Sequence, residues 1–172
     1  MNKFLPILAL LLATPIFAAE KISQIQVIAR YEGLDPAYGY VENLESGSKP
    51  QTDLTMPRAT TLSDRRFVVR MANDLRVPSR PENVSKEIGM TLDITPTIEG
   101  RTIKASGKSS ICALAFPLGN TPPQTVGFKI LETYFNQTFP NNKEVAIKLA
   151  DDIPGTLYLT FTLLNREGLP VE

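Results

Sequence analysis

Few residues in this chain could do chemistry, because its 172 residues include no histidine. Histidine is the usual general base near neutral pH, a common metal ligand and the partner of most serine and cysteine nucleophiles. We find no residue to assign as catalytic, cofactor-binding or metal-binding. The chain is therefore predicted not to be an enzyme and to need no cofactor.

Two short motifs resemble catalytic signatures but fail on spacing or local structure. Gly107–Ser109 matches the end of a phosphate-binding loop, yet that loop requires a glycine where this chain has Thr102. Ser46–Lys49 has the spelling of a serine/lysine hydrolase, which needs a helical turn to bring the lysine onto the serine. Gly47 and Pro50 oppose such a helix, so we expect a loop there.

Three further candidates have simple structural explanations. Asp151 and Asp152 could bind calcium through oxygen, but no acids follow at the required spacing, and we expect a capped turn. Asp64–Arg66 is expected to be a solvated or salt-bridged turn before a strand. Cys112 is the only cysteine, so it has no internal disulfide partner, and we expect it to fill space in the core.

The aromatic residues allow two interpretations. They could face a glycan or peptide ligand, with loops around Tyr38, Tyr40 and Pro122–Pro123 forming the site, or they could pack in the core and at its rim. Because they are spread over separate segments, we favour packing. The residues concerned are Tyr31, Tyr38, Tyr40, Tyr134, Phe135 and Phe139.

The elements that would position these residues are strands, since apolar and polar residues alternate in several segments. No segment shows helical periodicity, and 14 prolines accompany the short runs, which favours an all-β sandwich or barrel. Pro96 cannot donate to a ladder, so its strand should be at an edge or bulged there. Residues 32–55 are expected to form a long surface loop. Strands are predicted at Ile25–Tyr31, Phe67–Met71, Met90–Ile98, Val126–Ile130, Val145–Leu149 and Thr156–Leu163.

The first residues have the order of a secretory signal: Lys3, an apolar run at Phe4–Phe17, and then Ala18-Ala19. We predict a signal peptide at 1–19 and a single β-sandwich domain at 20–172, exported to the periplasm or outer cell surface. No transmembrane span is expected in the mature chain. The charge is balanced, with 18 basic and 18 acidic residues, which gives no reason to expect nucleic-acid binding.

One block of the sequence resembles a secretin, a ring protein of type II secretion and type IV pilus systems. Secretin domains carry a turn similar to Pro57–Ser63, then a strand, and then a glycine-led alternating strand similar to Ile88–Ile98. The resemblance extends upstream to Ile25–Tyr31 and, more weakly, downstream through Lys143–Leu163. It covers about residues 22 to 164 and implies a shortened secretin β-domain. The chain is also similar in size to small exported proteins encoded with type IV pilus-like machinery, and this similarity implies an all-β, immunoglobulin-like β-sandwich.

The resemblance also sets what we expect of function. Secretins have a much longer segment than this chain between Tyr31 and Pro57, so a shared topology is implied but not a pore. We expect a non-enzymatic structural or assembly protein of a type IV pilus-like or type II secretion-like system. Its expected partners are pilus or secretin components and further copies of itself, as a dimer or trimer.

Overall fold

The computed structural model describes residue 22 and residues 24–41, 49–77, 84–115, 127–149 and 154–171. Nine strands and one short helix lie in this part of the chain. They are β1 (Gln24–Glu32), η1 (Pro36–Tyr38), β2 (Leu54–Thr55), β3 (Ala59–Thr61), β4 (Phe67–Val77), β5 (Val84–Glu99), β6 (Thr102–Leu114), β7 (Phe128–Pro140), β8 (Glu144–Lys148) and β9 (Thr156–Leu164).

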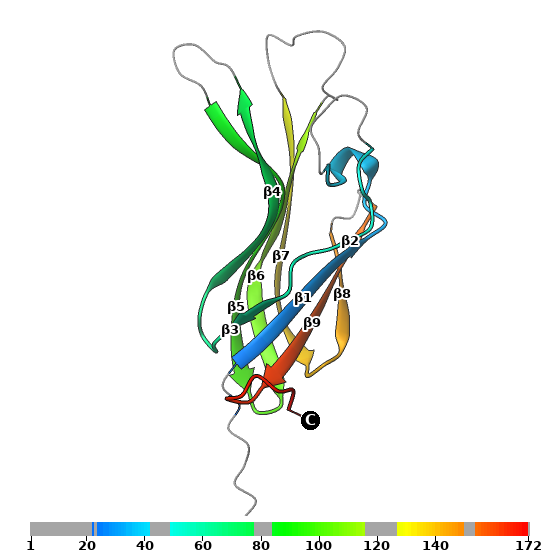
Figure 1. Cartoon of the computed structure of the whole chain (residues 1–172). Coiled ribbons are helices and arrows are strands. Elements are labelled where there is room, and N and C mark those ends of the chain that lie inside the picture. Colours follow the sequence, from blue (N-terminus) through cyan, green and yellow to red (C-terminus); the bar gives the residue numbers. More distant parts are fainter. Residues whose placement is uncertain are drawn as a thin grey trace, which may run out of the picture.

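The strands form two antiparallel sheets. One has the order β2-β1-β9-β8, with β3 also paired to β1, and the other is a meander with the order β4-β5-β6-β7. The four-stranded sheet runs the length of the molecule, and the sheet containing β1 and β9 crosses it obliquely over its lower part (Figure 1). The predicted all-β, two-sheet sandwich is confirmed.

The core lies between the sheets because each strand buries alternate side chains there. In β1 the buried positions include Ile25, Val27 and Tyr31, each at most 2% exposed. The two sheets meet through aromatic rings: Phe139 of β7 and Phe161 of β9 lie with their ring centroids 4.6 Å apart. Aromatic packing of this kind buries large apolar areas and fixes how the sheets lie against one another.

Four of the six predicted strands, β1, β4, β8 and β9, begin within one residue of the expected start, whereas β5 begins six residues early and β7 two residues late. The strands at β1, β8 and β9 also end within one residue of the prediction, whereas β4, β5 and β7 are longer than predicted. β6 was not predicted. Its inward positions include Ala105, Gly107 and Ser109, which are too small or too polar to show an apolar alternation.

The region 32–55 is mostly irregular, as predicted, but it is more than a surface loop. Leu34 and Leu54 are buried in the core, at 3% and 8% exposure. η1 begins at Pro36, and the Asp35 carboxylate accepts a hydrogen bond from the Ala37 N–H at its start. These contacts hold the segment against the sandwich.

Pro96 lies in β5 beyond the end of β4, whose first residue, Phe67, pairs with Ile94. β5 is therefore locally an edge, and the position confirms the expectation for a proline. The Pro96 carbonyl accepts a hydrogen bond from the Asp64 N–H (2.8 Å), so a turn occupies this side of the strand. Because Pro96 faces this turn and not a paired strand on that side, its lack of an N–H removes no hydrogen bond from the ladder.

In the part of the chain that the structure describes, no helix is long and apolar enough to cross a membrane. Residues 78–83, between β4 and β5, and residues 116–126, between β6 and β7, fall outside that part. The segment 1–19, predicted to be a signal peptide, also lies outside the described residues.

Candidate functional site on the four-stranded sheet

The four-stranded sheet has two long outer strands, β4 of 11 residues and β7 of 13 residues. Among the described residues neither of them pairs with a further strand on its outer side. The backbone N–H and C=O groups on such an edge can pair with another chain. Since consecutive strands are antiparallel, β4 and β7 run in opposite directions.

Large apolar side chains are exposed along these two edges. Of the five large hydrophobic residues that are exposed in the described structure, three lie on β4 and β7: Val68 at 40%, Ile130 at 54% and Tyr134 at 68%. All three point to the outward face of the sheet, away from the core. The ladder registers connect Val68 through Asp93 and Lys108 to Tyr134, so these two residues lie at the same level on opposite edges.

Ion pairs cross the outward face of this sheet. Arg66 binds the Asp93 carboxylate through two hydrogen bonds of 2.8 and 2.6 Å, and its guanidinium lowers the pKa of that carboxyl. Lys108 lies 2.6 Å from Glu132 and lowers the pKa of the Glu132 carboxyl, to which the Tyr134 hydroxyl also donates (2.8 Å). These charges are paired within the chain.

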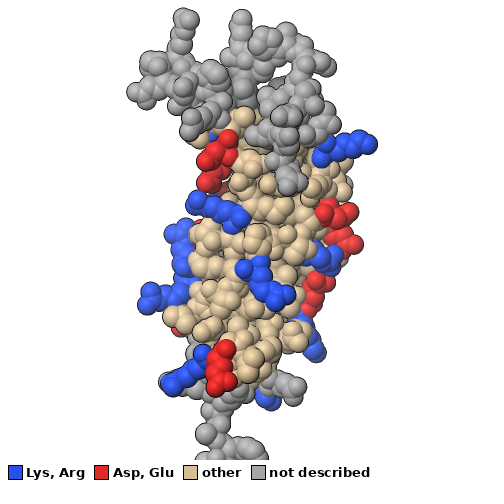
Figure 2. Space-filling model, in the orientation of Figure 1, with Lys and Arg blue, Asp and Glu red and all other residues tan. Residues whose placement is uncertain are grey.

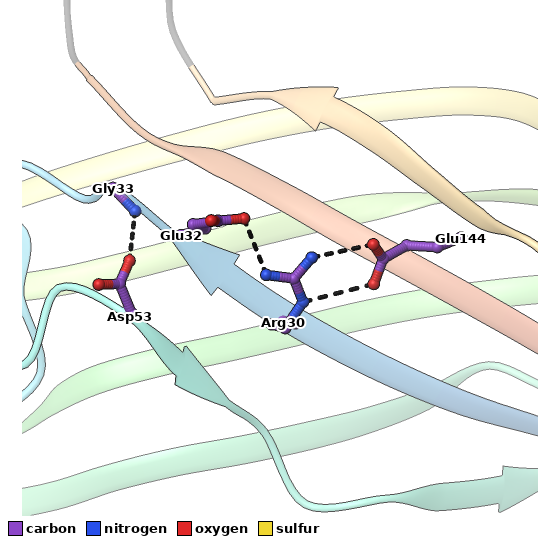
Figure 3. A network of polar contacts seen from close by, with 5 residues as sticks. All are labelled: Arg30, Glu32, Gly33, Asp53 and Glu144. Atoms are coloured by element: carbon purple, nitrogen blue, oxygen red, sulfur yellow. Dashed lines mark hydrogen bonds and ion pairs between the residues drawn. The ribbon is translucent and has the colours of Figure 1, made fainter.

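The outer face of the other sheet has a comparable cluster (Figure 3). Arg30 of β1 binds Glu144 of β8 and Glu32 of its own strand at 2.9 and 2.8 Å, and its guanidinium lies 4.3 Å from the centroid of the Tyr158 ring on β9. Glu144 and then Glu32 raise the pKa of Arg30. The cluster connects three adjacent strands, and its one guanidinium is shared by two carboxylates.

Over the face shown in Figure 2, separate basic and acidic groups are divided by wide uncharged areas. This agrees with the balanced composition of 18 basic and 18 acidic residues. Neither a nucleic acid nor an anionic surface finds a continuous basic area on this face.

The Gly107–Ser109 motif lies in β6, where successive side chains alternate between the two faces of the sheet. Lys108 points outward to Glu132, whereas Ser109 is buried and its hydroxyl lies 2.7 Å from the Tyr31 hydroxyl. A phosphate loop would need these residues to converge on one point, and their arrangement in β6 differs from that of such a loop.

The Asp64–Arg66 segment is a turn, and its charges are used within the protein. The Asp64 carboxylate accepts hydrogen bonds from the hydroxyls of Thr97 and Ser63, at 2.7 and 3.0 Å. Asp64 has a φ of 60°, a conformation that aspartate tolerates better than most residues. The prediction of a salt-bridged turn is confirmed for Arg66, through its bonds to Asp93.

The expectation for Cys112 was wrong. Ile111 is buried at 1% exposure, so alternation along β6 directs Cys112 to the outward face, where it is half-buried beside Gly89 and Ile130 in the ladder. The sequence did not show which of these neighbours faces inward. Burial raises the pKa of the Cys112 thiol, which disfavours the reactive thiolate.

The aromatic residues divide between the core and the surface. Tyr31, Phe135 and Phe139 are buried, while Tyr38 and Tyr40 are half-buried and pack against the core. The favoured packing interpretation holds for these five, and Tyr134 is the exception. Pro122–Pro123, Ser46–Ser48 and Asp151–Asp152 lie outside the described residues.

Sequence reasoning missed the edge residues Val68 and Ile130, and it named Tyr134 among the aromatic residues without assigning it to an edge strand. Alternation along β7 could have assigned Tyr134 to the outward face, but only if that strand had been predicted at its full length. Within the described ranges, no three histidine, cysteine or acidic side chains gather closely enough to hold a metal ion.

No protein-family model and no curated protein sequence matches the chain. Solved structures do match. The GspD chain of an ETEC pilotin–secretin AspS–GspD complex is similar with a TM-score of 0.55 and 10% identity, over 84% of this chain and 50% of that chain. The chain has the fold of a secretin β-domain.

Two other secretins agree with this assignment. The type II secretin XcpQ of Pseudomonas aeruginosa matches with a TM-score of 0.53 and 12% identity, over 85% of this chain and 60% of XcpQ. The type IV competence pilus secretin PilQ of V. cholerae matches with a TM-score of 0.51 and 9% identity, over 84% and 61% of the two chains. This chain spans about half the length of the GspD chain that it matches.

Proposed function

We propose that this protein is a non-enzymatic structural subunit that works by protein–protein contact, in a type II secretion-like or type IV pilus-like assembly. The observation that carries the proposal is the pair of long, unpaired outer strands with exposed apolar side chains. A sheet edge of this kind favours association with another chain. The secretin-like fold supports the choice of system, and the absence of histidine from the sequence supports a role without catalysis.

The two edges are chemically complementary. Because β4 and β7 are antiparallel, β4 of one copy can pair with β7 of the next while the outward faces stay continuous. In an unstaggered register, Val68 would lie opposite Tyr134, and Arg70 opposite Glu132. Apolar–aromatic and opposite-charge pairs across strands each contribute about 0.2–1 kcal/mol.

This head-to-tail contact is heterologous, so it either closes into a ring or continues as a fibre. The turn at Ser63–Asp64 covers the free side of β5 around Pro96, where the Ser63 hydroxyl accepts a hydrogen bond from the Ile98 N–H (3.0 Å). A covered edge limits further strand addition. We therefore expect a small closed oligomer, a dimer or trimer.

Sedimentation of edge variants tests the assembly. Val68→Lys and Ile130→Lys place charge on the two edges and should each convert a concentration-dependent oligomer into a monomer. Leu169→Lys is the matched control, since Leu169 is 55% exposed but lies outside both sheets. A strictly monomeric natural chain at high micromolar concentration, or variants that still assemble, would refute the proposal.

We also propose that the protein is exported and that it associates with secretin or pilus components. The signal-like segment at 1–19 supports export to the periplasm or outer cell surface, leaving one β-sandwich domain at 20–172. N-terminal sequencing of the protein recovered from the envelope should begin at Ala19 or Glu20. Affinity purification from that envelope should recover secretin or pilus components, and recovery from the cytoplasm with an intact N-terminus would contradict this part.

A further inference from the structure

A shallow trough crosses the outward face of the four-stranded sheet. Its volume is about 600 Å³. Two neighbouring rows of outward residues form most of it, one joining Asp93 to Lys108 and Tyr134, the other joining Thr95 to Ser106 and Asn136. Arg66 lies at the β4 side and Tyr134 at the β7 side, so the trough spans three strand spacings, or about 14 Å. Gly107 and Phe135 complete its lining.

The floor of the trough offers neutral hydrogen-bonding groups. Within the described structure, the side chains of Thr95, Ser106 and Asn136 make no hydrogen bond to the protein, unlike many polar side chains of this sheet. Two hydroxyls and an amide can both donate and accept. The trough can therefore satisfy a ligand that carries both donors and acceptors.

The charges around this floor are already neutralised. Arg66 binds Asp93 at 2.6 Å, and Lys108 binds Glu132 at 2.6 Å. A charged ligand would have to displace one of these partners and leave a charge of the protein without its counterion. Because these protein charges already have partners, the trough favours an uncharged ligand.

Tyr134 supplies an apolar surface at one end. Its ring is 68% exposed, and its orientation is fixed by the hydroxyl bond to Glu132 and by the Lys108 ammonium 5.8 Å from the ring centroid. A fixed ring loses little conformational entropy when a ligand packs on it. Molecules with apolar C–H faces and hydroxyl edges fit such a ring beside a polar floor.

We propose that this trough binds an uncharged oligosaccharide, a function separate from the assembly proposed above. An extended peptide is the competing ligand, but it recognises sheets mainly by adding a strand to an edge. Here Thr95 and Ser106 belong to β5 and β6, which pair with each other at this level, and the side of β5 that β4 leaves free at Pro96 is occupied by the Asp64 N–H; only Asn136 lies on the outer strand β7. A ligand on this floor must therefore be recognised by side chains, which is how a protein recognises a sugar chain.

Calorimetric titration of the mature protein tests this assignment. The probes are hexasaccharides of β-linked glucose, α-linked glucose and N-acetylglucosamine, with an acidic oligogalacturonate and an extended neutral peptide as comparisons. At least one neutral hexasaccharide should bind, and Tyr134→Ala should weaken that binding at least tenfold. Tyr134→Phe, which keeps the ring, and Ile130→Ala, on the same strand and face but outside the trough, should change it less than threefold.

The outcomes separate this inference from the assembly. Lack of binding by all three neutral hexasaccharides, or binding of only the acidic probe or the peptide, overturns it. So does binding that is unaffected by Tyr134→Ala in a variant whose circular dichroism is unchanged. The Ile130→Lys chain, changed at an edge residue that does not line the trough, should bind the saccharide as the natural chain does, so failure of the assembly leaves the trough testable by itself.

Discussion

Tyr31 and Ser109 form a polar contact between the two sheets, inside the core. Tyr31 belongs to β1 and Ser109 to β6, both are at most 1% exposed, and their hydroxyls lie 2.7 Å apart. Each hydroxyl satisfies the other, which avoids the free-energy cost of burying a polar group without a partner. Burial raises the pKa of Tyr31 to about 12, although the bond to Ser109 lowers it somewhat.

This shift predicts a loss of stability in alkali. Below pH 10 the Tyr31 hydroxyl is protonated in both states, so it adds no pH dependence. Between pH 10 and about 12 the unfolded chain releases the proton while the folded chain keeps it, and the free energy of unfolding falls as pH rises. Two pKa units correspond to about 3 kcal/mol at most.

Urea unfolding of the natural chain and of Tyr31→Phe between pH 7 and pH 12 checks this prediction. At pH 7 the variant should be less stable by about 1–2 kcal/mol, because Ser109 loses its buried partner. Above pH 10 the difference should shrink and then reverse, since the variant has no hydroxyl to titrate at this position. Parallel curves for the two chains would show that Tyr31 does not titrate as described.

At the scale of the elements, Gly89 determines how closely β4 and β5 approach. Gly89 has a φ of +136°, and a Cβ there would lie 2.3 Å from the Met71 carbonyl oxygen and 2.6 Å from the Ala72 Cα. Only glycine combines this backbone conformation with such a close contact. The residue therefore allows β5 to lie close to β4 at the level of Ala72.

Gly89→Ala should lower the free energy of unfolding by about 3 kcal/mol or more, through backbone strain and overpacking together. Gly100→Ala is the matched control, because Gly100 also has a positive φ (+64°) but no atom within 4 Å of the added Cβ. That variant should lose only about 1–2 kcal/mol, from backbone strain. Thermal unfolding of both variants measures the difference, and equal losses would argue against the close contact.

The strands that bury large apolar residues were predictable from the sequence, and the others were not. β1 and β9 alternate strongly because their inward residues face a core of rings and branched side chains. β6 has small inward residues, since large neighbours such as Phe135 fill the space opposite Gly107, and it therefore shows no such pattern. The two-sheet arrangement could be predicted, but the order of strands within each sheet could not.

The candidate surface was harder to predict for a related reason. Which strands are outermost depends on pairings between segments distant in sequence, and local alternation carries no information about them. Tyr134 looks like any other aromatic residue until β7 is known to be an edge and Phe135 to be its inward neighbour. The same uncertainty led to the wrong expectation for Cys112.

For the whole molecule, we predict that metal ions and nucleotides do not stabilise the fold. A ligand at 100 times its dissociation constant adds about 2.7 kcal/mol to stability if it binds only the folded state. Melting of the mature protein should be unchanged within error by ATP, zinc or calcium. A reproducible rise in the melting temperature with any of them would mean that a site has been overlooked.

The arrangement of β1 and β9 has a consequence for mechanical strength. The two strands are antiparallel neighbours, and Gln24, at the start of one, pairs with Leu164, at the end of the other. Force applied through the two chain ends would therefore act across this ladder at one end and peel it apart, breaking its hydrogen bonds one after another instead of shearing them all at once. A molecule held by its ends in optical tweezers should yield at low force. An attachment that must bear tension would need to use other points on the protein, such as the outer strands of the long sheet.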